Sequence, residues 1–279
     1  MTTYRALALS AKYWKPKEDY VLQITEAIAN KANNGDFVVV SEKALSISTA
    51  KIVDESRICP SRNAKLIARF CMRIGWGYFL GVLCGFGKRL LRRLKEYPIE
   101  YGSRHKQLVL QRAGLLQALM FGSEGGIDGS NLPYSLVSLP LDDAGAMATE
   151  IRKQIMKRLR KNVNVLIVDT DKTYSFKNFH FTPRPKPLKG IHSRGGVCAY
   201  LLGRVLKLKK RSTPLAVSGL RLQAEEALKI ANIADKARGS GSGATVWDMS
   251  ARFKVGVSGV TWGMLETLQH KPVVIVRQG

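Results

Sequence analysis

The sequence predicts a fold that mixes helices with strands, and three patterns indicate it. Two short apolar runs, 37–43 and 163–171, end in polar residues as buried strands do. Apolar residues recur at helical spacing over 141–161, which has acids at its start and bases at its end, as the helix dipole prefers. With 279 residues, 45% of them hydrophobic, the chain can bury the core of one large domain or two modest ones.

The remaining elements follow from the same patterns in chain order. Residues 4–10 are typical of a strand, and apolar residues at helical spacing predict a helix after Pro16 that ends before a turn at 34–36. The stretch 108–121 is apolar and ambiguous between helix and strand. Further along we expect an irregular basic stretch from Phe179, a helix from about Arg221, a loop or lid at 239–244 and a closing strand at 270–278.

One segment is apolar enough to raise the question of a membrane. Residues 74–87 carry no charge, but a spanning helix needs about 20 apolar residues, so we expect no membrane span. Gly77, Gly81 and Gly85 recur every four residues, which favours close packing in a buried helix or a subunit contact. The basic run at 88–95 leaves a position at a membrane interface as the weaker alternative.

The composition is strongly basic. Lys and Arg number 45 against 21 Asp and Glu, which gives a net charge of +24 and a pI of about 10.1. Such a charge attracts nucleotides, other anionic small molecules, nucleic acid or acidic membranes. The bases are spread over 88–95, 152–161 and 204–211, without a zinc-finger spacing, an aromatic RNA-binding signature or a helix-turn-helix pattern. Nucleic-acid binding is therefore an alternative that depends on net charge.

The cysteines and the N-terminal residues favour a cytoplasmic protein. The four cysteines lie far apart without a Cys-x-x-Cys pair, which is typical of reduced thiols. The four histidines are scattered, so they indicate neither a metal cluster nor a catalytic triad. The first 14 residues lack the charged start and the cleavage site of a signal peptide.

A glycine-rich stretch, GSEGGIDGSNLP at 122–133, surrounds a single aspartate, Asp128. Gly125 and Gly126 would let successive backbone N–H groups form a nest that binds an anion. A carboxylate on such a loop suits a hard cation such as Mg²⁺ or Mn²⁺, with substrate phosphates completing the coordination. The simpler interpretation is an ordinary surface turn, and composition alone favours it.

Polar residues also follow two of the predicted strands. Asp169, Thr170 and Asp171 come at the end of the second strand, where ligands tend to bind in α/β arrangements. Ser41 and Lys43 end the first strand, and the lysine would either meet a phosphate or remain solvated. Capping of the next element explains a strand-end aspartate equally well.

Four motifs occur in a fixed order along the chain: GDFVVVSEK at 35–43, GGIDGSN at 125–131, SLPLDDAGAMATEIRKQI at 138–155 and VDT at 168–170. This order resembles the gamma-glutamyl ligase of the deazaflavin coenzyme F-420. That family has a GD-x-[LV]-V-V strand before Ser-Lys, an N-A-G-I-D-x-S-N loop, an L-P-x-D-P-D-x-S-A-x-x-I-R line and an I-I-S-D-T strand end. The pairing of GIDGSN with VDT about forty residues later is fairly specific.

The resemblance covers roughly 4–56 and 104–171 and implies the architecture. The family fold is α+β, with mixed sheets and flanking helices, and it forms an intertwined homodimer. On this basis the 279 residues form one ligase-like unit. Its parts are a matched core (4–56 and 104–178), an insertion that is a candidate dimer contact (57–103) and an irregular basic C-terminal part (179–279).

The resemblance also implies a chemistry. The family enzyme uses GTP as co-substrate and Mg²⁺ or Mn²⁺ to phosphorylate the terminal carboxylate of an anionic deazaflavin precursor. The amine of L-glutamate then attacks the acyl phosphate and an amide forms. The roles implied are metal ligands (Asp128, Asp169, Thr170), nucleotide contacts (Ser41, Lys43, Asn131) and a phosphate loop (Gly125, Gly126).

The chain departs from the family pattern at three places. Ile47 and Thr49 stand where the family has a second lysine and a glutamate, and DKTYSFKNF replaces G-R-P-W-R after the Asp-Thr pair. STPLAVSGLRLQAEE replaces a T-E-[IL]-A-V-A-D-E segment. We therefore expect a divergent amide-forming ligase. The alternatives are a family member that kept the fold and an anion site without the activity, and a basic nucleic-acid-binding protein.

Overall fold

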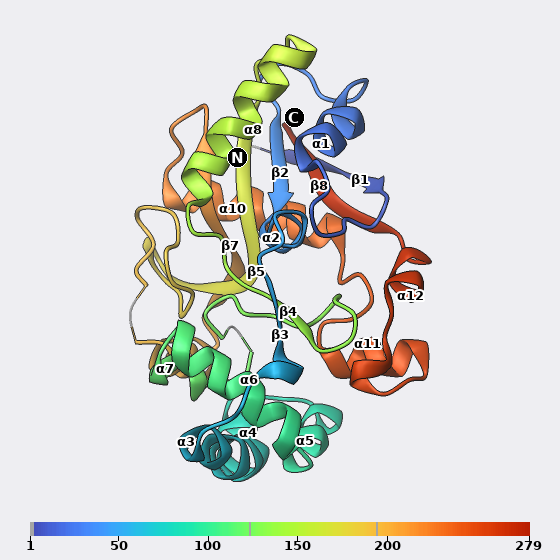
Figure 1. Cartoon of the computed structure of the whole chain (residues 1–279). Coiled ribbons are helices and arrows are strands. Elements are labelled where there is room, and N and C mark those ends of the chain that lie inside the picture. Colours follow the sequence, from blue (N-terminus) through green and yellow to red (C-terminus); the bar gives the residue numbers. More distant parts are fainter. Residues whose placement is uncertain (1–2, 123, 194) are drawn as a thin grey trace.

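The computed structural model describes residues 3–122, 124–193 and 195–279. Its upper half in Figure 1 is built on a mixed six-stranded sheet. The strand order is β1 (Tyr4–Ala11), β8 (His270–Gln278), β2 (Phe37–Ser41), β5 (Asn164–Phe176) and β6 (Phe179–Phe181), with β7 (Lys209–Ser218) paired to β5. β2 and β5 run parallel, and the other pairs of this sheet are antiparallel. The predicted α+β class, with mixed sheets and flanking helices, is confirmed.

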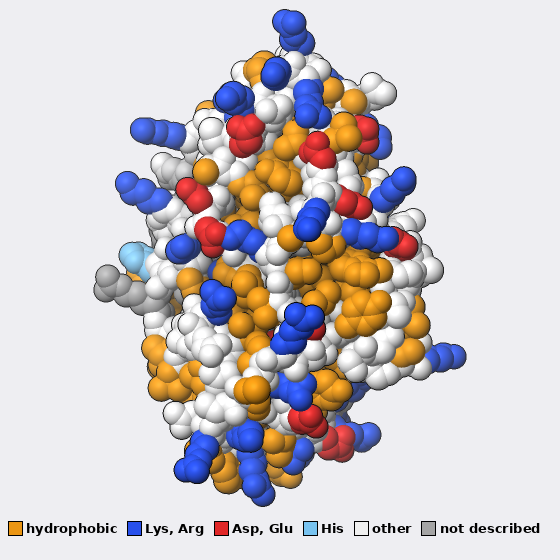
Figure 2. Space-filling view, viewed as in Figure 1, with side chains coloured by type: hydrophobic (Ala, Val, Ile, Leu, Met, Phe, Trp, Pro, Cys, Tyr) orange, Lys and Arg blue, Asp and Glu red, His pale blue; other side chains and the backbone are white. Residues whose placement is uncertain are grey.

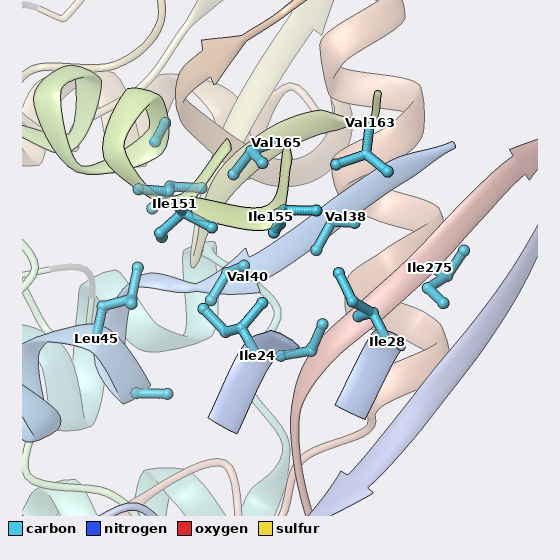
Figure 3. Close-up of a cluster of buried hydrophobic side chains, with 14 of the residues drawn as sticks. Ile24, Ile28, Val38, Val40, Leu45, Ile151, Ile155, Val163, Val165 and Ile275 are labelled. Atoms are coloured by element: carbon cyan, nitrogen blue, oxygen red, sulfur yellow. The ribbon is translucent and has the colours of Figure 1, made fainter. Parts of the chain in front are cut away.

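Helices cover both faces of this sheet (Figure 1). On one face lie α1 (Tyr20–Ile28) and α8 (Ala144–Leu159), and on the other lies α10 (Ala224–Arg238). The alternation of side chains along β2 explains why it is apolar throughout. Val38 and Val40 join Ile24 and Ile151 in one core (Figure 3), whereas Phe37 and Val39 join the α10 side.

The charge pattern predicted for α8 is present at both of its ends. The Asp143 side chain caps the helix by accepting a hydrogen bond of 2.8 Å from the Ala146 N–H. Lys157 and Arg158 lie in the last turn, where the helix dipole favours positive charge. The helix ends at Arg160, which adopts a left-handed backbone with φ 57°.

A helical lobe forms the lower end of the molecule in Figure 1. One continuous helix runs through α3 (Arg62–Leu66), the π-helical η2 (Ile67–Leu80) and α4 (Gly81–Leu83). It packs with α5 (Lys88–Lys95), α6 (Ile99–Arg112), α7 (Leu115–Ala118) and α9 (Val197–Val205). Trp76, Leu94 and Tyr200 are buried in the core of this lobe.

Short elements join the sheet to the lobe. They are α2 (Glu42–Ser48), the antiparallel pair β3 (Ile52–Asp54) and β4 (Leu136–Ser138), and the 3-10 turn η1 (Glu55–Arg57). A smaller cluster around Tyr13 and Met249 supports α11 (Val246–Phe253), the 3-10 turn η3 (Val257–Gly259) and α12 (Trp262–Glu266).

Two predicted strand ends were wrong. The first strand ends at Ser41, and Lys43 lies in α2, because Glu42 turns inward and accepts a hydrogen bond of 3.0 Å from the Leu141 N–H. The second strand does not end at 171 but continues to Phe176, with a register shift against β7 between Asp169 and Lys172. Its neighbour β2 stops opposite Val168, so the acids still begin where the parallel pair ends.

Two other regions are more regular than the sequence indicated. The ambiguous stretch 108–121 is helical, in α6 and α7, which are separated at Gly114 with φ 90°. The part 179–279 contains β6, α9, β7, α10, α11, α12 and β8, and irregular backbone is concentrated in the proline-rich stretch 182–193 and the loop 239–245. The helix predicted from about Arg221 and the strand at 270–278 are confirmed.

Two of the three glycines expected on one face, Gly77 and Gly81, pack within the chain. The expectation was wrong for Gly85, which lies beyond the end of the helix at Leu83, with φ 69° and open space where a Cβ would be. A Cβ at Gly77 would lie 3.0 Å from Lys95 Cγ, and one at Gly81 would lie 2.8 Å from Leu91 Cδ2. The helix face that carries Gly77 and Gly81 therefore packs against α5 of the same chain. The homodimer implied by the family resemblance stays a prediction.

By length and composition, the helix Arg62–Leu83 could cross a membrane. Its most apolar window has a mean hydropathy of 1.3, and 33% of that window is buried inside the protein. This helix begins before the uncharged segment 74–87, includes Arg69 and Arg73, and ends at Leu83.

Candidate functional site

A cleft of about 1230 Å³ opens between the sheet and the helical lobe. Its walls come from the ends of β2 and α2, the glycine-rich loop, the middle of β5 and the loop 239–245. The predicted site residues Ser41, Lys43, Gly126, Asp128, Asn131, Asp169 and Thr170 all line it. Residues from three separate motifs thus meet in one place, as expected for a site made by the fold.

Asp128 lies in a cluster with a lysine and a serine. Lys43 Nζ makes an ion pair with Asp128 Oδ2 and also donates to Ser130 Oγ at 2.8 Å. The Asp128 carboxylate accepts from the Ser130 N–H at 2.7 Å and from the Ser130 hydroxyl at 3.0 Å. The backbone of Asp128 pairs with Ser138 of β4, which fixes the loop to a strand. The side chains of Lys43 and Asp128 keep 21% and 37% of their surface exposed to the cleft, so a ligand can reach them.

Asn131 ties the glycine-rich loop to the loop 239–245. Its Oδ1 accepts from the Ser242 N–H at 2.7 Å and from the Ser242 hydroxyl at 2.6 Å. Its own backbone is left-handed, with φ 57°, and its carbonyl accepts a hydrogen bond from the Tyr13 hydroxyl. The loop or lid expected at 239–244 therefore borders the cleft, and the amide of Asn131 holds it there.

A buried arginine joins the other motifs beneath the cleft. Arg184 donates from Nη2 to both carboxylate oxygens of Glu42, at 2.6 and 2.7 Å, and from Nε to Asp169 Oδ2 at 2.6 Å. The side chains of Arg184 and Glu42 are 3% and 4% exposed. Burial opposes the charge on Arg184, but Glu42 and Asp169 outweigh it and raise the pKa of the guanidinium. This pairing fixes Asp169 at one wall of the site.

The same arginine shapes the phosphate loop predicted at Gly125 and Gly126. Arg184 Nη1 donates to the Gly125 carbonyl oxygen at 2.8 Å. Gly126 has φ 86°, and a Cβ there would lie 2.6 Å from Arg184 Nη2. Glycine is therefore required at position 126 by both its backbone conformation and its closeness to the guanidinium. Gly126 lines the cleft, whereas Gly125 is not among its lining residues and lies against Ala113.

A second buried network lies deeper in the cleft wall. His105 contacts Glu55 at 2.6 Å and Glu124 at 2.8 Å, and Lys106 Nζ lies 3.0 Å from Glu124. Burial opposes the charge on His105, but the two carboxylates outweigh it and raise its pKa to about 10. Burial likewise opposes the charge on Glu124, but Lys106 and His105 lower its pKa to about 2. The network therefore carries buried charges of both signs at neutral pH.

Arg204 adds a cationic, aromatic part to the cleft. Its guanidinium lies 5.4 Å from the ring centroid of Phe86 and 5.3 Å from that of Tyr200. Its Nε is buried and has no hydrogen-bond partner among the described residues. Burial lowers the pKa of Arg204, but its interactions and hydrogen bonds with Tyr200 and Tyr174 outweigh this effect and raise the pKa.

The oxygen donors of the cleft fit a divalent cation that arrives with a phosphate. Within the described ranges, no three or more His, Cys, Asp or Glu residues cluster as a metal site. Proteins bind Mg²⁺ through one or two carboxylates, with substrate phosphates and water completing the shell. Asp169 Oδ1 accepts only a long contact of 3.4 Å from the Asp171 N–H, and the exposed Thr170 lines the cleft beside it. A cation at Asp128 would have to displace the ammonium of Lys43.

Sequence reasoning did not identify Arg184, Glu42, Ser130 or Ser242. The family pattern has Arg-Pro shortly after the Asp-Thr pair, where this chain has DKTYSFKNF. In this chain an Arg184-Pro185 dipeptide follows the β5–β6 hairpin instead. Because the hairpin reverses the chain direction, Arg184 lies next to Asp169. The PRPKP run at 183–187 was therefore the signal in the sequence, and a search for Arg-Pro beyond the hairpin would have found it.

Comparison with known proteins identifies the family of the chain. The family model described as F420-0:gamma-glutamyl ligase matches residues 8–191, which include all four motifs. Tyr200, Arg204 and the loop 239–245 lie beyond the matched stretch. The chain is also 33% identical over 285 residues to the uncharacterized protein MJ1361 of Methanocaldococcus jannaschii. That alignment covers 98% of this chain and 96% of the relative. The chain therefore belongs to the coenzyme F-420 gamma-glutamyl ligase family.

Proposed function

We propose that this protein is a divergent ligase that uses GTP and a divalent cation to form an amide between a carboxylate and L-glutamate or a related amine. The observation that carries the proposal is the Lys43–Asp128–Ser130 cluster, built from the family's Ser-Lys and GIDGSN motifs at one wall of a large cleft. In this reaction the carboxylate takes the γ-phosphoryl group and GDP leaves. The amine then displaces phosphate from the acyl phosphate, and the amide forms.

The residues of the cleft support distinct roles in such a reaction. Lys43 can exchange the Asp128 carboxylate for a phosphate oxygen, because its ammonium ends a flexible side chain. Asp128, Asp169 and Thr170 offer oxygen ligands to Mg²⁺ or Mn²⁺, which would neutralise the charge of the phosphates. Ser41 and Asn131 line the same cleft and are available to the nucleotide. A volume of about 1230 Å³ is larger than a typical pocket for one small ligand and leaves room for a second substrate.

The missing family lysine has candidate replacements. Ile47 is buried in α2, and the Thr49 hydroxyl donates to the Leu45 carbonyl oxygen, so neither contributes charge to the cleft. Arg93 and Arg204 line the cleft from outside the matched motifs. Arg93 comes from the insertion 57–103 and is held by the Asp248 carboxylate at 2.8 Å. We propose that these arginines provide part of the grip on anionic substrates.

A family member that kept the fold without the activity is the second candidate. It is favoured by the two ion pairs, Lys43–Asp128 and Arg184–Asp169, which occupy the acids that the family uses for metal. Nucleic-acid binding is a third candidate, favoured by the net charge of +24. Steep salt dependence of RNA or DNA binding that survives Asp128→Asn would support it.

Thermal unfolding with GTP, ATP and GDP, each with and without Mg²⁺ or Mn²⁺, tests the proposal. A nucleotide at about a hundred times its dissociation constant stabilises the folded state by about 2.7 kcal/mol. Each kcal/mol raises Tm by roughly 2–4 °C in a chain of this size. We expect a metal-dependent shift with GTP that is lost in Asp128→Asn. The matched control is Asp142→Asn, because Asp142 also pairs with a lysine, Lys51, but lies exposed outside the cleft.

The outcomes separate the three candidates. A metal-dependent shift with GTP justifies a screen of carboxylate acceptors with L-glutamate, read as GDP release. Binding of nucleotide without GDP release from any acceptor favours the family member without ligase activity. If no nucleotide raises Tm, the ligase proposal fails and nucleic-acid binding becomes the next measurement.

A further inference from the structure

The helical lobe exposes an apolar surface that the ligase proposal does not use. Six large apolar side chains on the helix Arg62–Leu83 are between 46% and 67% exposed: Leu66, Phe70, Ile74, Phe79, Val82 and Leu83. From Leu66 to Val82 they are spaced three to five residues apart, and Leu83 follows directly. This spacing keeps most of them on one side, because the i→i+5 hydrogen bonds of η2 widen each turn. A contiguous exposed surface of this kind on a soluble protein marks a site of interaction.

Every charged residue of the lobe's first two helices is basic. From Arg62 to Lys95 the sequence contains nine bases and no Asp or Glu: Arg62, Lys65, Arg69, Arg73, Lys88, Arg89, Arg92, Arg93 and Lys95. Arg73 and Arg93 are engaged inside the protein, with the Tyr97 carbonyl oxygen and Asp248. The other seven are exposed. Figure 2 shows orange and blue side chains together at this lower end of the molecule. We call the exposed apolar and basic side chains of 62–95 the lobe face.

The lobe face belongs to a helix that lies on a protein core. Met72 and Trp76 of η2 are fully buried in the core of the lobe, and the Trp76 indole N–H donates to the Leu119 carbonyl oxygen at 2.8 Å. Gly77 and Gly81 are pressed against α5. Pulling this helix through a bilayer would expose that core and break those contacts. One side of the helix is thus buried against the protein, and the opposite side is exposed and available to a partner.

We propose that the lobe face binds the surface of an anionic lipid bilayer. Apolar side chains flanked by Lys and Arg are the composition that inserts into the boundary between headgroups and acyl chains while the bases meet lipid phosphates. Lys95 Nζ lies 4.3 Å from the ring centroid of the exposed Tyr78, so a basic and an aromatic side chain are already adjacent on the lobe face. The interaction is peripheral and leaves the cleft outside the membrane.

Charge complementarity favours a bilayer over a second copy of the chain. A two-fold contact places the same patch against itself, so seven exposed bases per protomer would face seven others without acids from this segment to offset them. A nucleic acid would satisfy the bases, but aliphatic residues such as Leu66 and Val82 do not stack on its bases. An anionic membrane satisfies both the apolar and the basic side chains.

Vesicle co-sedimentation of the full chain tests this proposal. We expect binding to vesicles of phosphatidylglycerol and phosphatidylcholine, little binding to phosphatidylcholine alone, and release as salt is raised. The pair Phe70→Ser with Phe79→Ser should weaken binding by at least about tenfold. The matched control is Leu7→Ser with Leu220→Ser, since these side chains are 51% and 57% exposed elsewhere on the protein.

A second set of variants tests the charges. Lys88→Gln, Arg89→Gln and Arg92→Gln together should weaken binding by roughly a hundredfold. The control removes the same charge from exposed bases of α8, with Lys153→Gln, Lys157→Gln and Arg158→Gln.

Three results would overturn the proposal. The first is no binding of the wild type to anionic vesicles, and the second is equal weakening by test and control variants. The third is a stable dimer in sedimentation equilibrium that the Phe70–Phe79 pair dissociates, without vesicle binding, which would assign the face to a second copy.

Discussion

Arg184 is the residue whose loss should disturb the site most. Its guanidinium donates hydrogen bonds of 2.6–2.8 Å to both oxygens of Glu42, to Asp169 Oδ2 and to the Gly125 carbonyl oxygen, and a longer one of 3.4 Å to the Pro185 carbonyl oxygen. Arg184→Met keeps much of the volume and removes the charge, which leaves the buried carboxylates of Glu42 and Asp169 without their cation. Removing one partner of a buried ion pair costs about 3–5 kcal/mol of folding free energy. We expect a loss of that size in equilibrium urea unfolding at neutral pH.

The pH dependence of this loss provides a second check. Burial already raises the pKa of Glu42 in the wild type, although Arg184 opposes it. Without the guanidinium this pKa rises further, so the folded variant binds a proton that the unfolded chain does not. Its stability therefore recovers as pH falls, and the loss should be smaller at about pH 5 than at neutral pH.

The matched control is Arg104→Met, whose ion pair with Glu100 is at the surface, with the Glu100 side chain 76% exposed. Such a pair contributes about 0–1 kcal/mol, so this variant should change stability little. If Arg184→Met loses less than about 1 kcal/mol, or no more than Arg104→Met, the reasoning about the buried cluster is wrong.

Three further predictions follow from the same region. Gly126→Ala should destabilise the fold by about 1–3 kcal/mol more than Gly35→Ala in urea unfolding, because both positions have φ 86° but only the first new Cβ would meet Arg184. His105→Gln should remove a contribution to stability that is fully present below pH 6.5 and is lost as pH rises through about 10, since its pKa is raised in the folded state. Asn131→Ala should speed amide exchange at Ser242 by about tenfold, because its Oδ1 accepts two hydrogen bonds from that residue.

Each of these has an outcome that contradicts it. Equal losses for the two glycine variants would mean that the clash at position 126 is relieved by movement of the guanidinium. A stability difference between wild type and His105→Gln that stays constant from neutral to alkaline pH would refute the raised pKa. Unchanged exchange at Ser242, with normal unfolding of the variant, would show that the loop 239–245 does not depend on Asn131.

The sequence predicted those elements whose pattern is local. The helix α8 was expected because its apolar spacing, its capping acid and its terminal bases all lie within 141–161. The end of the first strand was misplaced because Glu42 is polar yet buried, and its partner Arg184 lies 142 residues away. Polar residues normally mark the exposed end of a strand, so a buried acid cannot be distinguished by composition alone.

The sequence predicted most residues of the candidate site, but it did not predict the hydrogen bonds and ion pairs that join them. Family motifs drew attention to Asp128, Asn131 and Asp169, and the fold brings them to one cleft. Their closest partners are Lys43, Ser242 and Arg184, and the last two come from segments whose sequences carried no recognised motif. Which base meets which acid depends on tertiary packing, and no local pattern records it. The catalytic roles of these residues stay predictions.

The strand β8 makes the sheet depend on residues that are far apart in the chain. It pairs with β1 on one side and with β2 on the other, so residues 270–278 fill a gap between 4–11 and 37–41. The stretch 8–191 that matches the family model does not contain it. A fragment of that length also lacks β7, so β1, β2 and β5 would each have an unpaired edge, and the fragment would tend to aggregate rather than fold. During synthesis β1 therefore cannot pair with β8 until residues 270–278 have left the ribosome. Because this contact joins residues far apart in the chain, folding should be slow.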